Sequence, residues 1–267
     1  MKIWATANHK GGVGKTTSAI NLVGVMQKRG FRVLLVDLDP HGSLTSYFGL
    51  DPDEMNNSVY DLFQQTLSHN LNTKSTIRKT RFNRLHFIPA SSALATLDRQ
   101  LGTQDGMGLV IQKSLMQVAD HYDLAIIDCP PMLGLLMVNA LAACERLLIP
   151  VQTEFLALKG LERMVHTIDM IQKARKQKVR YSIIPTFYDL RLNASIETLK
   201  TLKQRYKETI WDGVIPTDTQ FREASQKGIP LTIERISSRG GRAYSHLLDY
   251  LLDLEEATTN LTMGSIE

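Results

Sequence analysis

The chain has 267 residues, of which 43% are hydrophobic and 22% charged, and this composition excludes an extended disordered protein. The net charge of +4 allows a polyanionic partner without requiring one. Only two cysteines, Cys129 and Cys144, are present, which excludes a disulfide framework and predicts a reducing, cytoplasmic environment.

Apolar runs of strand length alternate along the chain with segments of helical period. The runs are continuous rather than alternating, which is typical of strands covered on both faces in a parallel sheet. The predicted strands are residues 2–7, 32–37, 85–89, 124–128, 146–151, 180–186 and 213–215. The predicted helices include residues 16–29, 108–121, 160–178, 195–206 and 242–254. This alternation predicts an α/β fold with a doubly wound, mostly parallel sheet and helices on both faces, in a single domain over residues 1–267.

Two further segments indicate which part of the chain is a surface loop and whether any part crosses a membrane. The polar residues 68–84 are the best candidate for a mobile surface loop. The longest apolar stretch, residues 124–144, contains Asp128, Pro130 and Asn139, so it predicts a strand, a turn and a helix. A glycine-rich motif begins at residue 10 and leaves no room for a secretory signal before it. We therefore expect no stable membrane insertion.

The glycine-rich motif at residues 10–17 lies between the first predicted strand and the first predicted helix, which is the context of a phosphate-binding loop. Glycines accept positive φ and let backbone N–H groups approach phosphate oxygens, and the helix start directs its dipole at the same anion. Lys15 is expected to reach the β and γ phosphates, and the Thr16 hydroxyl to ligate magnesium. The predicted nucleotide-binding residues of this motif are Lys10, Gly11, Gly12, Val13, Gly14, Lys15, Thr16 and Thr17.

Carboxylates follow two of the predicted strands. Asp37 and Asp39 end the second strand, and Asp128 ends the fourth. Acids at the end of a buried strand are costly unless they face a cation or water, and with a phosphate loop nearby magnesium and an attacking water are the expected partners. The predicted magnesium site comprises Thr16, Asp39 and Asp128. The alternative is that the strand-end acids only cap a helix.

A strict phosphate-loop pattern asks for glycine at position 9, where this chain has His9, and a second lysine, Lys10, precedes the glycine pair. The sequence Lys-Gly-Gly-x-Gly-Lys-Thr resembles the deviant Walker A loop of the ParA/MinD family of P-loop ATPases. The resemblance implies that Lys10 contacts the nucleotide of a second subunit in an ATP-dependent homodimer. It also implies catalytic roles for Lys10, Lys15 and Asp39, with Asp39 orienting the hydrolytic water and Asp37 supporting it.

The likeness to this family extends over residues 2–250. Residues 152–160, 185–191 and 215–218 are similar to its dimer-face segment, its T-x-Y-D-x-R segment and its adenine-holding I-P-x-N turn. The resemblance therefore implies that Pro216 and Asp218 contact adenine, although aspartate replaces the usual asparagine. Similarly, His41 replaces a glutamine that usually follows the Asp-Pro pair.

A narrower likeness is to the ParC type of this family, which is encoded with polar chemotaxis and flagellar genes. Residues 39–49, 59–63 and 155–164 carry it. It implies partners at the cell pole, a cargo of chemoreceptor arrays and a cytoplasmic protein enriched at a pole.

Basic residues leave a nucleic-acid partner open. One set comprises Lys173, Arg175, Lys176, Lys178 and Arg180, and the other comprises Arg222, Lys227, Arg235, Arg239 and Arg242. The first is interpreted as a solvated helix end, whereas the second resembles the surface with which relatives bind DNA non-specifically.

The resemblance as a whole implies a slow, partner-stimulated ATPase that uses ATP and magnesium and acts as a dimerisation switch. Four alternatives remain. One is a DNA-binding partitioning ATPase, and another is a scaffold that binds ATP without hydrolysing it. A third is an iron–sulfur enzyme that uses Cys129 and Cys144. The last is a membrane positioner, which the acidic pair Glu255 and Glu256 near the C-terminus disfavours.

Overall fold

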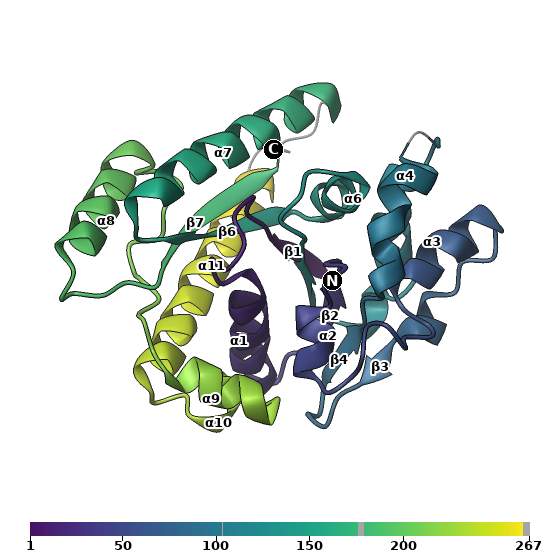
Figure 1. Cartoon of the computed structure of the whole chain (residues 1–267), viewed down its shortest axis with the longest axis horizontal. Coiled ribbons are helices and arrows are strands. Elements are labelled where there is room, and N and C mark those ends of the chain that lie inside the picture. Colours follow the sequence, from purple (N-terminus) through teal and green to yellow (C-terminus); the bar gives the residue numbers. More distant parts are fainter. Residues whose placement is uncertain (103, 176–178, 264–267) are drawn as a thin grey trace.

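A seven-stranded sheet runs through the centre of the protein in the order β3-β4-β2-β5-β1-β6-β7 (Figure 1). The structure is a computed structural model that describes residues 1–102, 104–175 and 179–263. The strands are β1 (Lys2–Thr6), β2 (Val33–Asp37), β3 (Arg78–Lys79), β4 (Leu85–Ile88), β5 (Leu124–Asp128), β6 (Arg146–Gln152) and β7 (Arg180–Thr186). All neighbouring strands pair in parallel except β3, which is antiparallel to β4. The predicted doubly wound, mostly parallel sheet is confirmed.

The predicted strand at residues 213–215 does not form. Instead, the chain beside β7 makes two isolated bridges, from Ile210 to Ile183 and from Pro216 to Tyr188. The Ile215 amide still donates to the Pro185 carbonyl at 2.8 Å, and the Thr217 amide donates to the Tyr188 carbonyl at 3.0 Å, so the segment lies beside β7 without forming a strand.

Eleven α-helices in the described ranges surround the sheet. They are α1 (Lys15–Lys28), α2 (Ser43–Tyr47), α3 (Val59–Leu67), α4 (Leu97–Leu101), α5 (Val110–Met116), α6 (Leu135–Ala143), α7 (Phe155–Arg175), α8 (Asn193–Arg205), α9 (Gln220–Lys227), α10 (Leu231–Glu234) and α11 (Arg239–Met263). The predicted helix at 108–121 is split into α5 and flanking 3₁₀ turns, Met107–Leu109 and Ala119–His121. Among the described residues, no helix is long and apolar enough to cross a membrane.

The segment expected to be a mobile loop, residues 68–84, contains structure. It holds the 3₁₀ turn Thr73–Thr76 and strand β3, and the side chains of Thr73 and Thr76 are buried. The Thr73 hydroxyl donates to the Ser114 carbonyl at 3.0 Å, which ties the segment to α5. Polar composition was a poor guide here because the polar groups are satisfied internally.

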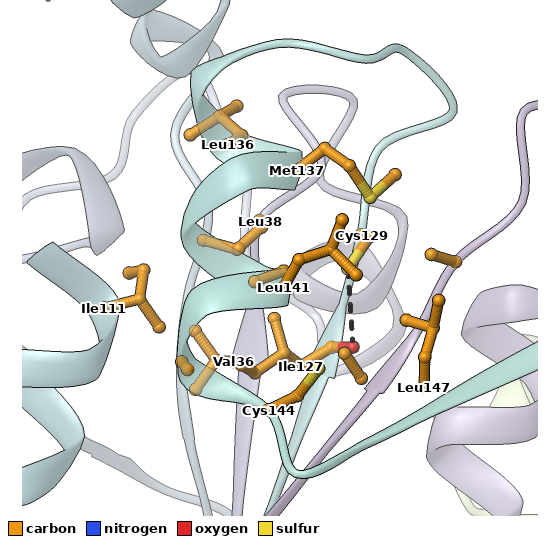
Figure 2. Packing of buried hydrophobic residues seen from close by; sticks show 14 of the residues in the cluster. Val36, Leu38, Ile111, Ile127, Cys129, Leu136, Met137, Leu141, Cys144 and Leu147 are labelled. Carbon is orange, nitrogen blue, oxygen red and sulfur yellow. Dashed lines mark hydrogen bonds between the residues drawn. The ribbon is translucent and has the colours of Figure 1, made fainter. Parts of the chain in front are cut away.

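Each face of the sheet is covered by its own hydrophobic layer, as the strand pattern predicted. Trp4 packs with α1 and α11 on one face, whereas Ile3 and Ala5 pack on the opposite face with α5, α6 and α7 (Figure 1). Figure 2 shows Cys129 and Cys144 in the second layer, among apolar side chains of α6 and the sheet. Both thiols are buried, and burial raises the pKa of each. Neither can reach the surface to hold a cluster between subunits.

The C-terminal helix is fixed to the sheet by a buried carboxylate. Glu255 of α11 accepts from Arg146 at 2.6 Å and from Arg180 at 3.4 Å. Glu255 is 3% exposed, so it is not a surface acid that repels lipid, and this part of the argument against a membrane anchor was wrong.

Candidate nucleotide-binding site

The glycine-rich loop connects β1 to α1, as predicted, and its backbone takes conformations that favour glycine. Gly12 has φ +74° and Gly14 has φ +96°, both in the left-handed region. The N–H of Ser18 donates to the Gly14 carbonyl at 2.8 Å, which is the first bond of α1. The amides of Lys15, Thr16 and Thr17 precede this bond, so they have no partner within the helix and form an anion-binding end.

Three side chains outside the loop hold its backbone in place, of which Asn8 and Thr186 are buried and Gln152 is half-buried. The amide of Lys10 donates to the Asn8 side chain at 3.1 Å, and Gln152 donates to the Gly12 carbonyl at 3.1 Å. The Thr186 hydroxyl donates to the Val13 carbonyl at 2.9 Å. Sequence reasoning missed these positioning residues, although polar residues at the ends of buried strands are a signal that could have found them.

The loop opens onto a cavity of about 480 Å³. It is lined by Gly11, Gly12, Gly14, Lys15, Thr16 and Thr17, together with Asp39, His41 and Pro131. The Lys15 ammonium donates to the Lys10 carbonyl at 3.4 Å, so this cation lies across the loop. The side chain of Val13 points into the core and contributes only its backbone.

A second hollow, of about 430 Å³, adjoins the first and shares six of its residues, which are Gly12, Gly14, Thr17, Phe187, Phe221 and Ser225. Pro216 and Asp218, which are predicted to contact adenine, line this second hollow. The carboxylate of Asp218 accepts from the amides of Gln220 (3.0 Å) and Gly240 (3.2 Å). Asp218 therefore also holds the starts of α9 and α11.

Two aromatic side chains at this end were not predicted as site residues. Phe187 and Phe221 line both hollows, and Phe187 has φ +53°, which is unusual for a bulky residue. Aromatic faces at the end of a cleft suit the stacking of a planar base. The left-handed Phe187 follows Thr186 directly, and that threonine anchors the phosphate loop.

The carboxyl ends of the central strands bring the predicted magnesium residues together. The sheet register pairs Asp128 with both Thr6 and Asp37. Asp128 accepts from the Thr16 hydroxyl at 2.6 Å through one oxygen and from Thr6 at 3.0 Å through the other. Burial is the main reason that the pKa of Asp128 is raised to about 6, whereas the two threonines lower it.

This donor set fits a magnesium–nucleotide rather than a metal held by protein alone. No group of three or more His, Cys, Asp or Glu residues in the described part of the chain could hold a metal ion. A hydroxyl and a carboxylate beside a phosphate cradle are the oxygen donors that Mg²⁺ uses with phosphates and water. Thr16 and Asp128 would hold the ion, and Asp39 lines the same cavity as Thr16.

Asp37 and Asp39 have different environments despite their spacing. Asp37 is fully buried and accepts from the amide and hydroxyl of Thr45 at 2.9 and 2.7 Å. It also accepts from the Asp39 amide at 3.2 Å, which holds the backbone of the loop that carries Asp39. Burial, followed by the negative charge of Asp128, raises the pKa of Asp37 to about 8. His41 donates its amide to Asp39 at 3.0 Å, and its ring lies 2.9 Å from the same oxygen.

The second lysine of the motif points away from the cavity. The Lys10 ammonium forms an ion pair with Glu154 and a 3.1 Å hydrogen bond with Gln152. Lys10 does not line the nucleotide cavity, unlike Gly11 and Lys15. Of the predicted loop residues, Gly11, Gly12, Gly14, Lys15, Thr16 and Thr17 line the cavity, whereas Lys10 and the buried side chain of Val13 do not.

The basic residues are distributed around the surface. Lys176 and Lys178 lie outside the described residues, and Arg180 is paired with Glu255. In the second set, Lys227 is paired with Glu234, and Arg222 lines the second hollow beside Pro216 and Asp218. Arg239 and Arg242 lie together on the wall of another surface hollow.

Comparisons with known proteins agree with this geometry. Residues 1–181 match the family described as AAA domain. The chain is 36% identical over 247 residues to the sporulation initiation inhibitor protein Soj of Bacillus subtilis, covering 92% of this chain and 96% of that protein. It is 33% identical over 249 residues to the chromosome partitioning protein ParA of Myxococcus xanthus, with 90% and 87% covered.

Solved structures give the same result at the level of the fold. Cobyrinic acid a,c-diamide synthase from Mycobacterium smegmatis, with bound ADP and magnesium, has a TM-score of 0.82 and 30% identity over 97% of this chain and 96% of that one. The septum site-determining protein MinD of Pyrococcus horikoshii has a TM-score of 0.75 at 22% identity, with 95% and 97% covered, which is a likeness of fold alone. The fold, the loop geometry and these relatives together show that the chain belongs to the ParA/MinD family of P-loop ATPases.

Proposed function

We propose that the protein is an ATP-dependent dimerisation switch that hydrolyses ATP slowly and positions a cellular cargo. The observation that carries the proposal is the orientation of Lys10, which stands outside the cavity of its own chain while Lys15 lies within it. A second cation at the mouth of a phosphate site is well placed to meet the phosphates of a facing subunit.

The surface around Lys10 suits a second copy of the chain. Apolar side chains are exposed there, including Phe155 (69% exposed) and Leu156 (68%), which follow Glu154 directly. Met132 (74% exposed) follows Pro131, a residue of the nucleotide cavity, after one peptide bond. Clustered exposed apolar side chains are typical of interaction surfaces.

ATP and magnesium are the proposed cofactors, and the diamide synthase of Mycobacterium smegmatis has been solved with bound ADP and magnesium. The loop amides and Lys15 bind the phosphates, and Thr16 and Asp128 provide the oxygen ligands for the ion, which supplies charge neutralisation at the phosphates. Asp39 orients the attacking water, and its position is fixed through Asp37 and His41. Pro216 and Asp218 contact the base.

The test is size-exclusion chromatography with saturating ATP and magnesium, together with a nucleotide-binding assay. Lys15→Gln is expected to lose nucleotide binding and to stay monomeric, because the cation across the loop is lost. Asp39→Ala is expected to bind ATP and remain dimeric, because hydrolysis is slowed while binding is kept. A monomeric Asp39→Ala at saturating ATP would contradict the switch, and unchanged phosphate release by that variant would contradict the role of Asp39.

The cargo is proposed to be polar chemoreceptor arrays, with protein partners at the cell pole. The support for this is the sequence likeness of residues 39–49, 59–63 and 155–164 to the ParC type. A fluorescent fusion in cells tests it. Cytoplasmic protein with polar foci that follow the arrays is expected, and foci that are indifferent to array position would refute the cargo.

The second candidate is a chromosome- or plasmid-partitioning ATPase that binds DNA without sequence preference. The likeness to the chromosome partitioning protein ParA of Myxococcus xanthus supports it, as do Arg239 and Arg242 on one surface hollow. When a protein contacts only the phosphate backbone of DNA, its affinity for DNA falls steeply as the salt concentration rises. DNA binding that requires ATP, weakens strongly with salt and is reduced by Arg242→Ala would favour this candidate, as would a nucleoid-wide distribution in cells.

A further inference from the structure

A third cavity, of about 710 Å³, lies at the β3 edge of the sheet and is separate from the phosphate loop. Its walls come from the end of α2 and the residues after it, from β3, and from the C-terminal end of α9. We call it the β3 cavity. Its size is in the range of ligand-binding clefts, although neither Lys15 nor any loop glycine of the motif lines it.

The charged residues of the β3 cavity are all cations. They are Arg78, Lys79, Arg81 and Lys227, and no aspartate or glutamate lines it. Lys227 is paired with Glu234 at 2.6 Å. The other three form none of the ion pairs found among the described residues. The wall therefore carries an uncompensated positive charge, which attracts an anionic group.

The guanidinium groups are held in place by main-chain carbonyls rather than by acids. Arg81 donates to the Gly228 carbonyl at 2.7 Å, and Arg78 donates to the Asn56 carbonyl at 2.7 Å. The Nε atom of Arg78 is buried and has no hydrogen-bond partner. The carbonyls hold the two guanidinium groups in place without neutralising their positive charge. A carboxylate of a bound ligand would supply the compensating negative charge.

Strand β3 also offers an open main-chain edge. Among the residues that the structure describes, it pairs only with β4, and the sheet ends there. Arg78 is opposite Phe87 in this pairing, and the Thr80 amide donates to Leu85, so the main chains of Arg78 and Thr80 face β4. Alternate residues of an antiparallel strand bond to opposite sides, so the N–H and C=O of Lys79 face outward. Such an edge accepts an added extended segment.

Apolar side chains line another part of the β3 cavity, beside polar residues such as Thr80 and Gln226. Phe48 and Phe87 line it with their ring centroids 4.9 Å apart, and Leu50 and Met55 lie beside them. This surface suits a single apolar side chain of a bound segment, with the cations suited to its neighbours. A peptide that alternates acidic and apolar residues in an extended conformation has both features on its two faces.

We propose that the β3 cavity binds an acidic, extended segment of a partner protein, which adds to the edge of β3 and places an apolar side chain against Phe48 and Phe87. The inference goes beyond the proposed switch and does not depend on ATP hydrolysis. It differs from a subunit contact because the cavity lies at the opposite edge of the sheet from β6 and β7, whose ends carry Glu154 and Phe187.

Helix α2 connects the β3 cavity to the nucleotide site, so a segment bound in the cavity can affect that site. Tyr47 and Ser225 line both the β3 cavity and the phosphate cavity. Thr45 of the same short helix holds the Asp37 carboxylate, and the loop that carries Asp39 leads directly into α2. A segment that fixes the end of α2 therefore biases the position of the Asp39 loop.

The experiment is selection of peptides of about a dozen residues from a random display library on the full-length protein loaded with an ATP analogue and magnesium. We expect the enriched peptides to be acidic with at least one large apolar residue. Binding of one such labelled peptide is then measured by fluorescence anisotropy. Lys79→Glu is expected to weaken it about tenfold, since a nearby attraction becomes a repulsion.

Lys74→Glu is the matched control, because Lys74 is exposed and lies in the preceding 3₁₀ turn but does not line the β3 cavity. It is expected to leave the affinity within about twofold. Arg78→Gln, which removes charge while keeping a polar side chain, is expected to weaken binding as well. Unaltered nucleotide binding by each variant shows that it is folded.

Three results would overturn the proposal: no enriched peptide, enriched peptides that are neutral or basic, or equal losses in Lys79→Glu and Lys74→Glu. Methylation of alternate peptide amides tests the strand addition, and undiminished binding by both methylated forms would refute it. Because binding is read directly, failure of the dimerisation switch leaves this result intact, and failure here leaves the switch intact.

Discussion

Lys10 and Glu154 form an ion pair within one chain, at the mouth of the nucleotide cavity. The side chains are 39% and 48% exposed, so solvent screens the pair and it contributes less than about 1 kcal/mol to stability. Because the ion pair is weak, Lys10 can exchange Glu154 for another anionic partner. When a facing subunit presents a triphosphate, Lys10 can leave Glu154 at little cost.

Glu154→Gln is expected to increase ATP-dependent dimerisation. The substitution removes the charge that competes for Lys10 while keeping the shape of the side chain. Because the pair is weak, we expect the dimerisation constant to rise by a few-fold at most, about two- to fivefold. Sedimentation velocity over a range of protein concentrations with saturating ATP measures it.

Glu162→Gln provides the control, since Glu162 lies on α7, the helix that begins directly after Glu154, and pairs with Arg205 at 2.7 Å. It is expected to dimerise like the unmodified protein. Equal behaviour of the two variants would show that Glu154 does not restrain Lys10.

Thr16→Ala is expected to weaken magnesium-dependent nucleotide binding by about tenfold or more, because it removes one proposed ligand and the 2.6 Å hydrogen bond that orients Asp128. Isothermal titration with ATP, with and without magnesium, measures the effect. We expect the affinity for ATP to fall only in the presence of magnesium and to be unchanged without it. Thr201→Ala, which removes a hydroxyl bonded within α8, is the control. Equal weakening with and without magnesium would contradict the ligand role.

Asp37 makes stability depend on pH in the ligand-free protein. Its pKa is raised to about 8, so the folded chain holds a proton that the unfolded chain loses near pH 4. The folded state therefore binds more protons between about pH 4 and pH 8, and the free energy of unfolding falls as pH rises through this window.

Asp37→Asn is expected to remove this pH dependence. The difference between its free energy of unfolding and that of the unmodified protein should shift in favour of the variant by at least about 1 kcal/mol as the pH rises from about 5 to about 8. Urea unfolding at both pH values measures it. Asp212→Asn, at a side chain that is 99% exposed, is the control and should show no such trend. If the difference in free energy of unfolding between Asp37→Asn and the unmodified protein is the same at both pH values, Asp37 is not protonated in the folded state.

Gly11 offers a cleaner test of subunit contact than Gly12. An added Cβ at either position meets no atom of its own chain within 4 Å, but Gly12 has φ +74° and a side chain there is strained. Gly11→Val is expected to keep the unfolding free energy within about 0.5 kcal/mol and to lose ATP-dependent dimerisation by crowding the facing subunit. Gly160→Ala on α7, also in open space, is the control. A normal dimer of Gly11→Val would refute close contact at the loop.

Much of the fold follows from the order of apolar runs and glycine-rich turns. The strand ends at Asp37 and Asp128 were predicted because continuous apolar residues ended in an acid, and the register places both acids side by side. By contrast, β3 was missed because a strand of two charged residues, Arg78 and Lys79, carries no apolar pattern.

The site was predicted where a motif fixes backbone geometry and missed where tertiary contacts do. Gly12, Gly14, Lys15 and Thr16 could be placed because a phosphate loop requires their residue types. Asn8 and Gln152 act only because β1 and β6 are neighbours in the sheet, which local sequence does not reveal. The pairing of Lys10 with Glu154 likewise joins residues far apart in sequence.

A crystal structure of Asp39→Ala with ATP and magnesium would show directly whether Lys10 contacts the nucleotide of a second subunit. We expect two facing copies, with each Lys10 released from Glu154 and its ammonium in hydrogen-bond contact with the triphosphate of the other copy. A nucleotide-filled structure in which Lys10 still pairs with Glu154 of its own chain, with no phosphate of another copy nearby, would contradict it.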